Sequence, residues 1–418
     1  MGAAPPGALE PGMTSPRRLA ALLLLVAACS SGPSPTGPSQ LPDEGDARIL
    51  QRVLAGTLAP AEGLQQVASS GGWPIQTSKG FLFALLDGGY GPYRLTSPNG
   101  AFDPVELKSE AGVAWGLVAV PAGAQYRFAT HFGDGFADPL SRRFLYTPGE
   151  VGLVAAGGAH LERWTGVGGV DRRIVPRTLR VWVPADHPTH VLYAHDGQNL
   201  FDPAGPWGGW RPDLAAASTT LIVGIDNTSS RFAEYTHVPD YPSVEGAWGD
   251  AYADYVEQVV RPFVEARYGV PARTGLMGSS LGGLISLYVN LRFPGRYDFV
   301  ASLSGTVGWG SLQSGLHNPT VIELYQALPA CPAGTLYLDS GGGPGLTGCL
   351  DSDGDGIFDD GDGADNYCEN AQLRDVLVGL GCTTSLHDAW ELGASHDEAA
   401  WKYRVNRPGG VLDLFEAL

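Results

Sequence analysis

The fold is decided by one stretch of sequence, Thr274-Gly275-Leu276-Met277-Gly278-Ser279-Ser280-Leu281-Gly282-Gly283. It joins an apolar, strand-like segment to a helical pattern that continues to Phe293, and its centre has the form G-x-S-x-G. This motif requires a strand before it and a helix after it, because the serine lies on a sharp turn between the two. Gly278 and Gly282 provide flanking positions without side chains. We therefore expect Ser280 to be a nucleophile, and a chance match to the motif is the alternative.

The turn also places Ser280 at a helix N-terminus, where the Leu281 amide is expected to stabilise a developing oxyanion. A serine hydroxyl is a weak nucleophile at neutral pH and needs a histidine, which follows the serine and the acid in chain order. Three histidines follow Ser280. His387 falls inside a strand-like segment and His317 precedes the region expected to hold the acid, whereas His396 lies in a Gly-containing loop after the last strand. We expect His396 to be the general base; a surface loop histidine is the alternative.

Strand-like and helical segments alternate on both sides of the elbow, which predicts a mostly parallel sheet covered by helices on both faces over residues 161–418. The clearest helix is expected from Asp250 to Tyr268, with a bend at Pro262. The expected strands are Leu179–Val183, Val191–His195, Thr220–Ile225, Thr274–Gly278, Phe299–Leu303, Thr335–Asp339 and Ser385–Leu392.

Residues 47–160 precede this region and carry short, β-rich apolar runs between Gly80 and Tyr146, separated by Gly, Pro and Asn turn signals. We expect a small all-β sandwich there. It contains no triad-like set and no cluster of metal ligands, so a packing or positioning role is favoured over ligand binding.

The first residues have the pattern of an export signal. Arg17-Arg18 precede an apolar run that is too short to span a bilayer, and Val26-Ala27-Ala28 before Cys29 resembles the lipobox of bacterial lipoproteins. We expect residues 1–28 to be a signal peptide, Cys29 to be lipidated, and residues 29–46 to be a flexible linker. Ser30 favours the outer membrane, on its periplasmic or cell-surface face. A secretory signal with an incidental cysteine is the alternative.

The formal net charge of −18 argues against nucleic-acid binding, because phosphate recognition needs clustered Lys and Arg and no such cluster follows residue 18. Anionic partners are disfavoured.

The region after residue 160 resembles the enterochelin esterase-like esterases, a branch with esterase D-like and feruloyl esterase relatives. The matching stretches are His195-Asp196-Gly197-Gln198-Asn199-Leu200-Phe201-Asp202, Val223-Gly224-Ile225-Asp226-Asn227 with Arg231 and Glu234-Tyr235, the Ser280 elbow, and His396 with Trp401. Residues 47–160 resemble the immunoglobulin-like domain that precedes the enzyme in enterochelin esterases, through Tyr126-Arg127-Phe128 and Ala137–Arg143.

This resemblance implies an α/β-hydrolase fold and an ester hydrolase that needs no cofactor for catalysis. It also implies a second oxyanion amide at Gly197-Gln198, and a substrate cleft lined by Arg231 and Tyr235. The alternatives are an ordinary strand-end turn at Gly197-Gln198 and a helix-surface ion pair between Arg231 and Glu234.

The acid departs from the family pattern. Relatives carry it a few residues beyond the strand that ends here at Asp339, but this chain continues Ser340-Gly341-Gly342-Gly343-Pro344-Gly345. We favour Asp365, because Asp365-Asn366-Tyr367 directly precedes the helical stretch Glu369–Leu380 and so restores the family order of acid, loop and helix. The other candidates in the insert are Asp351, Asp353, Asp355, Asp359, Asp360 and Asp362.

The insert 349–368 also has the D-x-D-x-D-G spacing of a calcium loop, in which alternate carboxylates converge on one hard cation. It resembles the calcium repeats of thrombospondin type 3 modules, although Asp362 stands where a bidentate Glu is usual. A solvated acidic loop is the alternative. The expected ligands of a structural Ca²⁺ are Asp351, Asp353, Asp355, the Ile357 carbonyl, Asp359 and Asp362.

Four cysteines remain besides Cys29, an even set with three possible pairings. Cys331 and Cys382 each precede a core strand, and neighbouring parallel strands would bring them together. Cys349 and Cys368 would then close the acidic insert. Coordination of a metal by these cysteines is disfavoured without interleaved histidines.

These observations favour a serine carboxylic-ester hydrolase acting on an extracytoplasmic small-molecule or glycan-linked ester, such as a siderophore-type ester. Two alternatives stay open. The displaced acid fits a catalytically inactive surface-binding lipoprotein, and the resemblance of the antigen 85-like mycolyltransferases to the same branch fits acyl transfer to an alcohol.

Overall fold

The computed structural model describes residues 41–133, 135–155, 157–169, 171–205, 208–241, 247–312, 316–359 and 365–418. The expected signal peptide, Cys29, the linker up to residue 40 and Asp362 lie outside the described residues. Residues 41–418 form one compact unit. Within the described ranges, none of the helices combines the length and the apolar character needed to cross a membrane.

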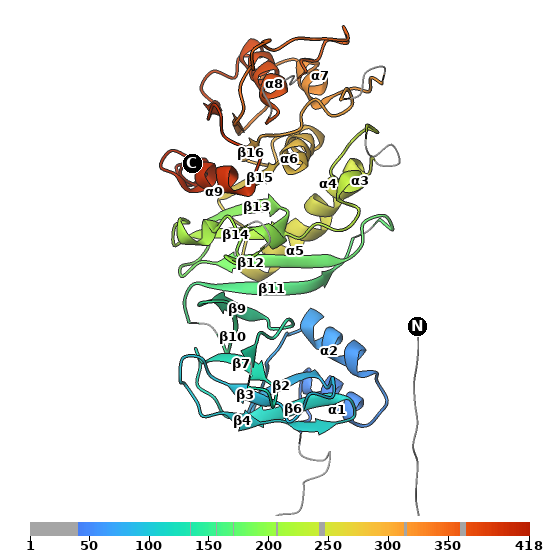
Figure 1. Ribbon diagram of the computed structural model, residues 1–418, viewed down its shortest axis with the longest axis vertical. Helices are drawn as coiled ribbons and strands as arrows, with labels where there is room; N and C mark the ends of the chain where they lie inside the picture. Colours follow the sequence, from blue (N-terminus) through green and yellow to red (C-terminus); the bar gives the residue numbers. More distant parts are fainter. Residues whose placement is uncertain are drawn as a thin grey trace, which may run out of the picture. The chain divides into compact units, whose positions relative to one another are not determined.

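A large mixed sheet organises residues 160–390 (Figure 1). Its strands lie in the order β11-β12-β14-β13-β15-β16-β17-β18, with β12 antiparallel to both neighbours and the pairs from β14 to β18 parallel. Each of the seven expected strands is present, and β11 is an additional one. The bounds are β11 (His160–Val167), β12 (Arg177–Val183), β13 (His190–His195), β14 (Thr220–Ile225), β15 (Arg273–Ser279), β16 (Phe299–Leu303), β17 (Thr335–Ser340) and β18 (Leu386–Trp390).

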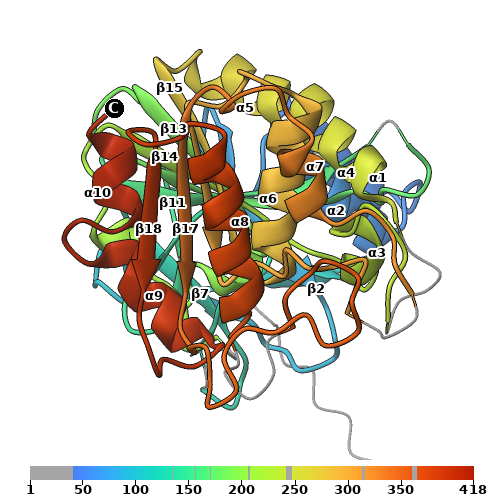
Figure 2. The ribbon, with the colours of Figure 1, turned by 90° about the horizontal axis from the view of Figure 1, so that it is seen from above.

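Helices cover both faces of this sheet because its central strands are apolar on both faces. In β13, Val191 and Tyr193 belong to one buried cluster and Leu192 and Ala194 to the other. Figure 2 shows α9 and α10 on one side of β17 and β18 and α8 on the other. The helices are α3 (Arg231–Glu234), α4 (Gly249–Tyr255), α5 (Arg261–Tyr268), α6 (Leu281–Arg292), α7 (Val321–Gln326), α8 (Tyr367–Gly379), α9 (Glu398–Asn406) and α10 (Val411–Glu416), with short 3₁₀ turns η2 (Gly197–Asn199) and η3 (Pro212–Leu214).

The helix expected from Asp250 to Tyr268 is present but changes its winding. A π-helical segment, η4 (Val256–Val260), joins α4 to α5, and Pro262 follows directly in the first turn of α5. Proline lacks an N–H and clashes with the carbonyl four residues before it, and a wider turn relieves that clash. A π-helical segment therefore lies directly before Pro262, where the sequence predicts a bend.

Residues 47–160 are not all-β, so that expectation is wrong. The region begins with α1 (Ala47–Leu54) and α2 (Pro60–Ser69), and in α1 the apolar Leu50, Val53 and Leu54 recur at helical spacing and are buried. The strands that follow are β1 (Ile75–Thr77), β2 (Gly80–Leu86), β3 (Arg94–Thr96), β4 (Val105–Glu106), β5 (Lys108–Glu110), β6 (Val113–Val118), β7 (Gln125–Ala129), β8 (Gly135–Phe136), β9 (Arg143–Tyr146) and β10 (Glu150–Leu153).

The N-terminal region and the large sheet are continuous. Strand β9 pairs with β11 through Phe144–Leu161 and Arg143–Glu162, and the order continues through β10, β7, β3 and β4. A separate sheet, β1-β2-β6-β5, packs with α1 and α2. The boundary expected between residues 160 and 161 therefore falls at the start of β11, inside a continuous sheet.

Candidate active site

The elbow at Ser280 has the geometry that its sequence predicts. β15 ends at Ser279, α6 begins at Leu281, and Ser280 between them has φ 55° and ψ −124°, a conformation that residues with side chains rarely adopt. The Ser280 N–H donates to the Leu303 carbonyl at 2.9 Å, and its carbonyl accepts from Thr306 N–H at 3.2 Å. These bonds hold the turn against β16 and the loop after it.

Gly278 of the motif and Gly283 directly after it have no room for a side chain, whereas a Cβ at Gly282 would make only ordinary contacts. A Cβ at Gly278 would lie 2.5 Å from the Gly282 carbonyl group, and one at Gly283 would lie 2.5 Å from the Ser302 hydroxyl. Real Cβ atoms are not found at such distances, so each position needs glycine.

Ser280 lines a cavity of about 500 Å³ at the carboxyl ends of the parallel strands, where ligands bind in open α/β sheets. Its hydroxyl lies 3.4 Å from the Thr306 hydroxyl. The cavity is lined by Ser280, His396, Gln198, Asn227, Arg231 and Glu398, among others. It therefore brings together expected site residues that follow β13, β14, β15 and β18 in the chain.

His396 and Asp365 lie side by side. The distance from His396 Nδ1 to Asp365 Oδ1 is 2.7 Å, and the Asp365 side chain is 1% exposed. The other oxygen of Asp365 accepts from the Ser304 hydroxyl at 2.9 Å and from the Gly341 N–H. His396 also meets Trp401 edge to face, with ring centroids 5.0 Å apart. Of the candidate acids, the structure thus places Asp365 against the expected base.

Asp365 reaches the loop after β17 although it comes 25 residues later than Ser340 in sequence. The Ser340 hydroxyl donates to the Asp365 carbonyl at 2.7 Å, and Asp365 itself has a left-handed φ of 61°. A Cβ at Gly341 would lie 2.4 Å from the Asp365 carboxylate. The glycine-rich loop after β17 therefore leaves the space that this carboxylate fills.

The expected oxyanion donors lie at neighbouring strand ends. Leu281 is the first residue of α6, and Gln198 lies in η2, directly after β13. Among the residues that the structure describes, neither the Leu281 nor the Gln198 N–H donates to an acceptor. A Cβ at Gly197 would lie 2.4 Å from the Gly224 backbone, so glycine is needed for η2 to lie against β14.

Arg231 lines the cavity, but Tyr235 does not. Arg231 forms a two-pronged ion pair with Asp196, at 2.8 Å from Nε and 2.8 Å from Nη2. Tyr235 is completely buried behind this pair, with its ring 5.1 Å from the Arg231 guanidinium. The expected cleft position of Tyr235 is therefore wrong, because the aromatic ring is part of the core. The alternative pairing of Arg231 with Glu234 is also wrong, since Glu234 pairs with the buried Arg177 at 2.7 Å.

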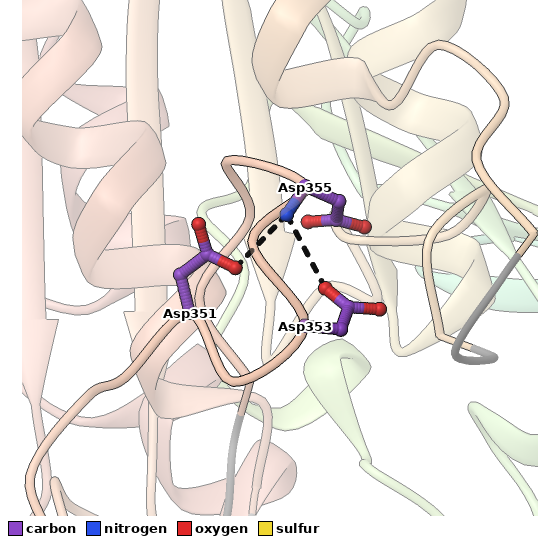
Figure 3. Close-up of side chains that lie close together, drawn as sticks. All are labelled: Asp351, Asp353 and Asp355. Atoms are coloured by element: carbon purple, nitrogen blue, oxygen red, sulfur yellow. Dashed lines mark hydrogen bonds between the residues drawn. The ribbon is translucent and has the colours of Figure 1, made fainter.

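The acidic insert brings three carboxylates together. Oxygens of Asp351, Asp353 and Asp355 lie within 4.8 Å of one another (Figure 3). The Asp355 N–H donates to Asp351 Oδ1 at 3.0 Å, and Asp355 Oδ2 accepts from Ser311. Oxygen ligands of this kind suit a hard cation.

The other expected calcium ligands are the Ile357 carbonyl, Asp359 and Asp362. Asp359 is not in the group formed by Asp351, Asp353 and Asp355, and its carboxylate accepts from the Ser352 N–H at 2.9 Å. The Ile357 side chain is buried, whereas Asp362 lies outside the described residues. His317 contacts Asp355 and Glu323, at 3.3 and 3.1 Å, rather than the Ser280 cavity.

Both expected disulfides are present. Cys331–Cys382 joins the residues that lead into β17 and β18, and Cys349–Cys368 closes the acidic insert. Cys368 is three residues after Asp365 and lies in the first turn of α8. The second bond therefore fixes the chain close to the carboxylate that contacts His396.

Sequence reasoning missed the buried polar residues behind His396. They are Ser304, Asp339 and Arg404, all fully buried, and Glu398 at the cavity wall. Burial raises the pKa of Asp339 to about 7, despite the neighbouring Arg404, and burial also raises the pKa of Glu398. The three-residue spacing of Trp401 and Arg404 was a usable signal, because it puts both side chains on one face of a helix.

A protein-family model described as "Putative esterase" matches residues 175–407, more than half of the chain. The chain belongs to this esterase family. The family expected from the His195, Arg231, Ser280 and His396 stretches is thereby confirmed.

Two curated relatives match part of this chain. The uncharacterized protein YbbA of Bacillus subtilis is 25% identical over 154 residues, which are 34% of this chain and 61% of the relative. The siderophore triacetylfusarinine C esterase of Aspergillus fumigatus is 30% identical over 137 residues, which are 30% of this chain and 47% of the relative. The chain thus matches only about half to three fifths of the length of these two relatives.

Solved structures of similar proteins include an enterobactin esterase and a siderophore hydrolase. An enterobactin esterase from Shigella flexneri aligns with a TM-score of 0.44 and 16% identity, covering 81% of this chain and 93% of the other. A siderophore hydrolase from Aspergillus nidulans aligns with a TM-score of 0.43 and 19% identity, covering 62% and 94%.

Proposed function

We propose that the protein is a serine carboxylic-ester hydrolase, with Ser280 as nucleophile, His396 as general base and Asp365 as the acid. The observation that carries this proposal is the 2.7 Å contact between His396 Nδ1 and the buried Asp365, with His396 and Ser280 facing the same cavity. A carboxylate at Nδ1 fixes the imidazole so that Nε2 can accept the serine proton.

In the proposed reaction, His396 removes the Ser280 proton as the oxygen attacks an ester carbonyl. The amides of Leu281 and Gln198 stabilise the tetrahedral oxyanion, aided by the N-terminus of α6. His396 then protonates the leaving alcohol, and water activated by the same base releases the acid from the acyl-enzyme.

The Ser280 hydroxyl contacts Thr306 and must turn toward His396 to react. Such movement is expected, because catalytic hydrogen bonds in enzymes without substrate are often long and tighten in the complex.

We propose a small-molecule or glycan-linked ester as substrate, with siderophore-type esters as the first candidates. The support is the named activity of the Aspergillus fumigatus relative. A panel of siderophore, feruloyl and simple acyl esters, with a sugar acceptor in a parallel arm, tests this and separates hydrolysis from acyl transfer by the products formed.

The alternative, an inactive binding lipoprotein, is motivated by the displaced acid and by the N-terminal domain, which has no assigned role. The contact between Asp365 and His396 favours the enzyme over this alternative, and fluorophosphonate labelling of Ser280 separates the two.

Ser280→Ala provides the central test. Wild type is expected to hydrolyse an ester of the panel and to label covalently with a fluorophosphonate, and the variant is expected to lose both. Ser279→Ala, which changes the neighbouring buried serine, is expected to keep the labelling. Ester hydrolysis that survives in Ser280→Ala would overturn the assignment.

We also propose that the acidic insert binds a structural Ca²⁺ through Asp351, Asp353 and Asp355, with no direct part in the chemistry. The support is the convergence of their oxygens within 4.8 Å. Repulsion between unscreened carboxylates at this range favours a bound cation.

Finally, we propose that the protein is exported and anchored through a lipidated Cys29, on the outer membrane. The support is the order of charge, apolar run, small residues and cysteine in residues 17–29. Incorporation of labelled palmitate into wild type but not into Cys29→Ser tests the anchor, and equal labelling of both would overturn it.

A further inference from the structure

A buried arginine lies directly behind the proposed triad. Arg404 is on α9, eight residues after His396, and its side chain is 0% exposed. Its Nη1 lies 2.7 Å from Asp339 Oδ1, and its Nη2 lies 3.7 Å from Asp365 Oδ2. One guanidinium thus lies between two buried carboxylates, and one of the two contacts His396.

Ser304 connects the three charged groups. Its hydroxyl donates to Asp365 Oδ2 at 2.9 Å and accepts from Arg404 Nη1 at 3.2 Å and from Trp401 Nε1 at 3.1 Å. Its N–H donates to Asp339 Oδ1 at 2.9 Å. The network therefore orients Asp365 Oδ2, the carboxylate oxygen that does not contact His396.

Two carboxylates in a water-excluded site repel each other, and one tends to take up a proton. Asp339 has this tendency, since burial, together with a smaller contribution from the charge of Asp365, raises its pKa to about 7 despite the neighbouring Arg404. The other groups nearby are Glu391, 3.6 Å from Arg404 Nε, and Tyr337 and Arg407 beside Asp339. Arg404 is the fully buried cation that contacts both carboxylates, whereas Arg407 is only half-buried.

We propose that Arg404 is a positioning residue that holds the Asp365 carboxylate directed at His396 Nδ1 by placing a positive charge between it and Asp339. This inference rests on the proposed ester hydrolysis. Asp365 arrives from the insert without a cation of its own, and Arg404 on the helix after His396 supplies one. Arg404 thus affects His396 through Asp365 and does not contact the substrate.

The charge-balance role predicts a specific rescue. In Arg404→Met, no cation lies between the two buried carboxylates, so their repulsion displaces Asp365 from His396 Nδ1. We expect kcat at pH 8, where Asp339 is ionised, to fall about tenfold or more with KM nearly unchanged, and the acidic limb of the kcat/KM profile to move to higher pH. Adding Asp339→Asn removes the second carboxylate, so Arg404→Met/Asp339→Asn is expected to regain most of the lost kcat and the original limb.

Arg142→Met is the matched control. Arg142 is also a buried arginine, but it lies in the N-terminal region and donates to the carbonyls of Ala68 and Ser70. We expect this variant to lower the melting temperature without moving the pH profile. A purely structural role of Arg404 would make the double variant as inactive as the single one, and that result would overturn the inference.

Fluorophosphonate labelling separates this failure from failure of the proposed function. If wild-type Ser280 does not label, the esterase proposal itself fails. If wild type labels and Arg404→Met keeps the wild-type pH profile, only the role of Arg404 is wrong. Thermal unfolding of each variant identifies any loss that comes from misfolding.

Discussion

Asp365 lies later in the sequence than the acid of the family pattern, yet its carboxylate lies next to His396 in the structure. Its side chain is buried, contacts His396 at 2.7 Å and accepts from Ser304 and Gly341. A buried carboxylate with this many donors is held in one orientation, as an acid that fixes a histidine tautomer must be.

Asp365→Asn is therefore expected to lower kcat about 10³–10⁴-fold with a small change in KM, because the amide can no longer hold His396 in the reactive tautomer. Steady-state kinetics on an ester cleaved by wild type provide the measurement. Asp375→Asn, at an exposed position of α8, is the control and should behave as wild type. Comparable activity of Asp365→Asn and wild type would remove Asp365 from the mechanism.

His195 is a buried histidine whose titration affects stability rather than catalysis. Its Nδ1 lies 2.9 Å from the Tyr252 hydroxyl, and burial lowers its pKa to about 4. In the unfolded chain its pKa is about 6.5, so between these values only the unfolded state takes up the proton.

The free energy of unfolding is thus expected to fall by about 2–3 kcal/mol from this group as pH drops from about 6.5 to about 4. Urea unfolding at pH 7, 5.5 and 4.5 measures it. His195→Asn, which keeps a polar group near Tyr252, should lose less stability over the same interval. An equal loss in variant and wild type would assign the pH dependence to other groups.

At the scale of elements, the acidic insert links a proposed cation loop to the active site. Asp355 accepts from Ser311, in the loop that follows β16, and the Cys349–Cys368 bond ends at the helix that begins just after Asp365. The conformation of the acidic insert and the position of Asp365 are therefore linked through the disulfide and the hydrogen bond to Ser311.

Removal of Ca²⁺ by a chelator is expected to lower the melting temperature and to reduce kcat, and added Ca²⁺ should restore both. Differential scanning fluorimetry and ester hydrolysis, each with and without chelator, provide the measurement. In Asp351→Asn/Asp353→Asn, chelation should have little further effect. Identical stability and activity with and without chelator would contradict the cation site.

At the scale of the whole molecule, the N-terminal region is attached to the esterase region through its sheet. β9 pairs with β11, and Arg163 on β11 forms a 2.8 Å ion pair with Glu150 on β10. Arg142 also stacks on Trp164, 3.6 Å from the ring centroid. Separating the two regions would expose a long strand edge and apolar surface.

A chain that starts at residue 157 is therefore expected to aggregate or to unfold at a much lower temperature than residues 41–418. Size-exclusion chromatography and circular dichroism of the two chains test this. A monomeric truncated chain with an unchanged unfolding transition would show that the esterase region folds alone.

The charge of the molecule also bears on its substrate. The net charge is −18, and at the cavity Asp196 and Arg231 neutralise each other while Asp397 and Glu398 remain. Such a cleft attracts cations and repels anions over about a Debye length.

For two esters of one alcohol that differ in a cationic or an anionic acyl terminus, we expect kcat/KM to favour the cationic ester by about tenfold at low salt. The preference should shrink as ionic strength rises, since salt screens the interaction. Kinetics at two salt concentrations measure it. Preference for the anionic ester, or no effect of salt, would contradict an electrostatic role for the cleft.

Most features that depend on residues close together in the sequence or on adjacent strands were predicted correctly, whereas several that depend on long-range packing were not. The elbow, the seven expected strands of the esterase region and the disulfide pairs could be predicted, because each depends on local spacing or on neighbouring strands. Tyr235 was misplaced because its role was carried over from the family resemblance, and a matching sequence does not distinguish a cavity wall from the core behind it. The helices α1 and α2 were missed because a resemblance to a β domain outweighed the spacing of Leu50, Val53 and Leu54.

The sequence alone determined the position of Ser280 and its glycines, since a sharp strand-to-helix turn constrains only the residues within and beside it. It also narrowed the acid to a few aspartates after β17. Only the tertiary structure placed Asp365 against His396 and brought Arg404, Ser304 and Asp339 behind it. These groups come from four separate segments, and their shared burial depends on how β16, β17, the insert and α9 pack, which local pattern does not encode.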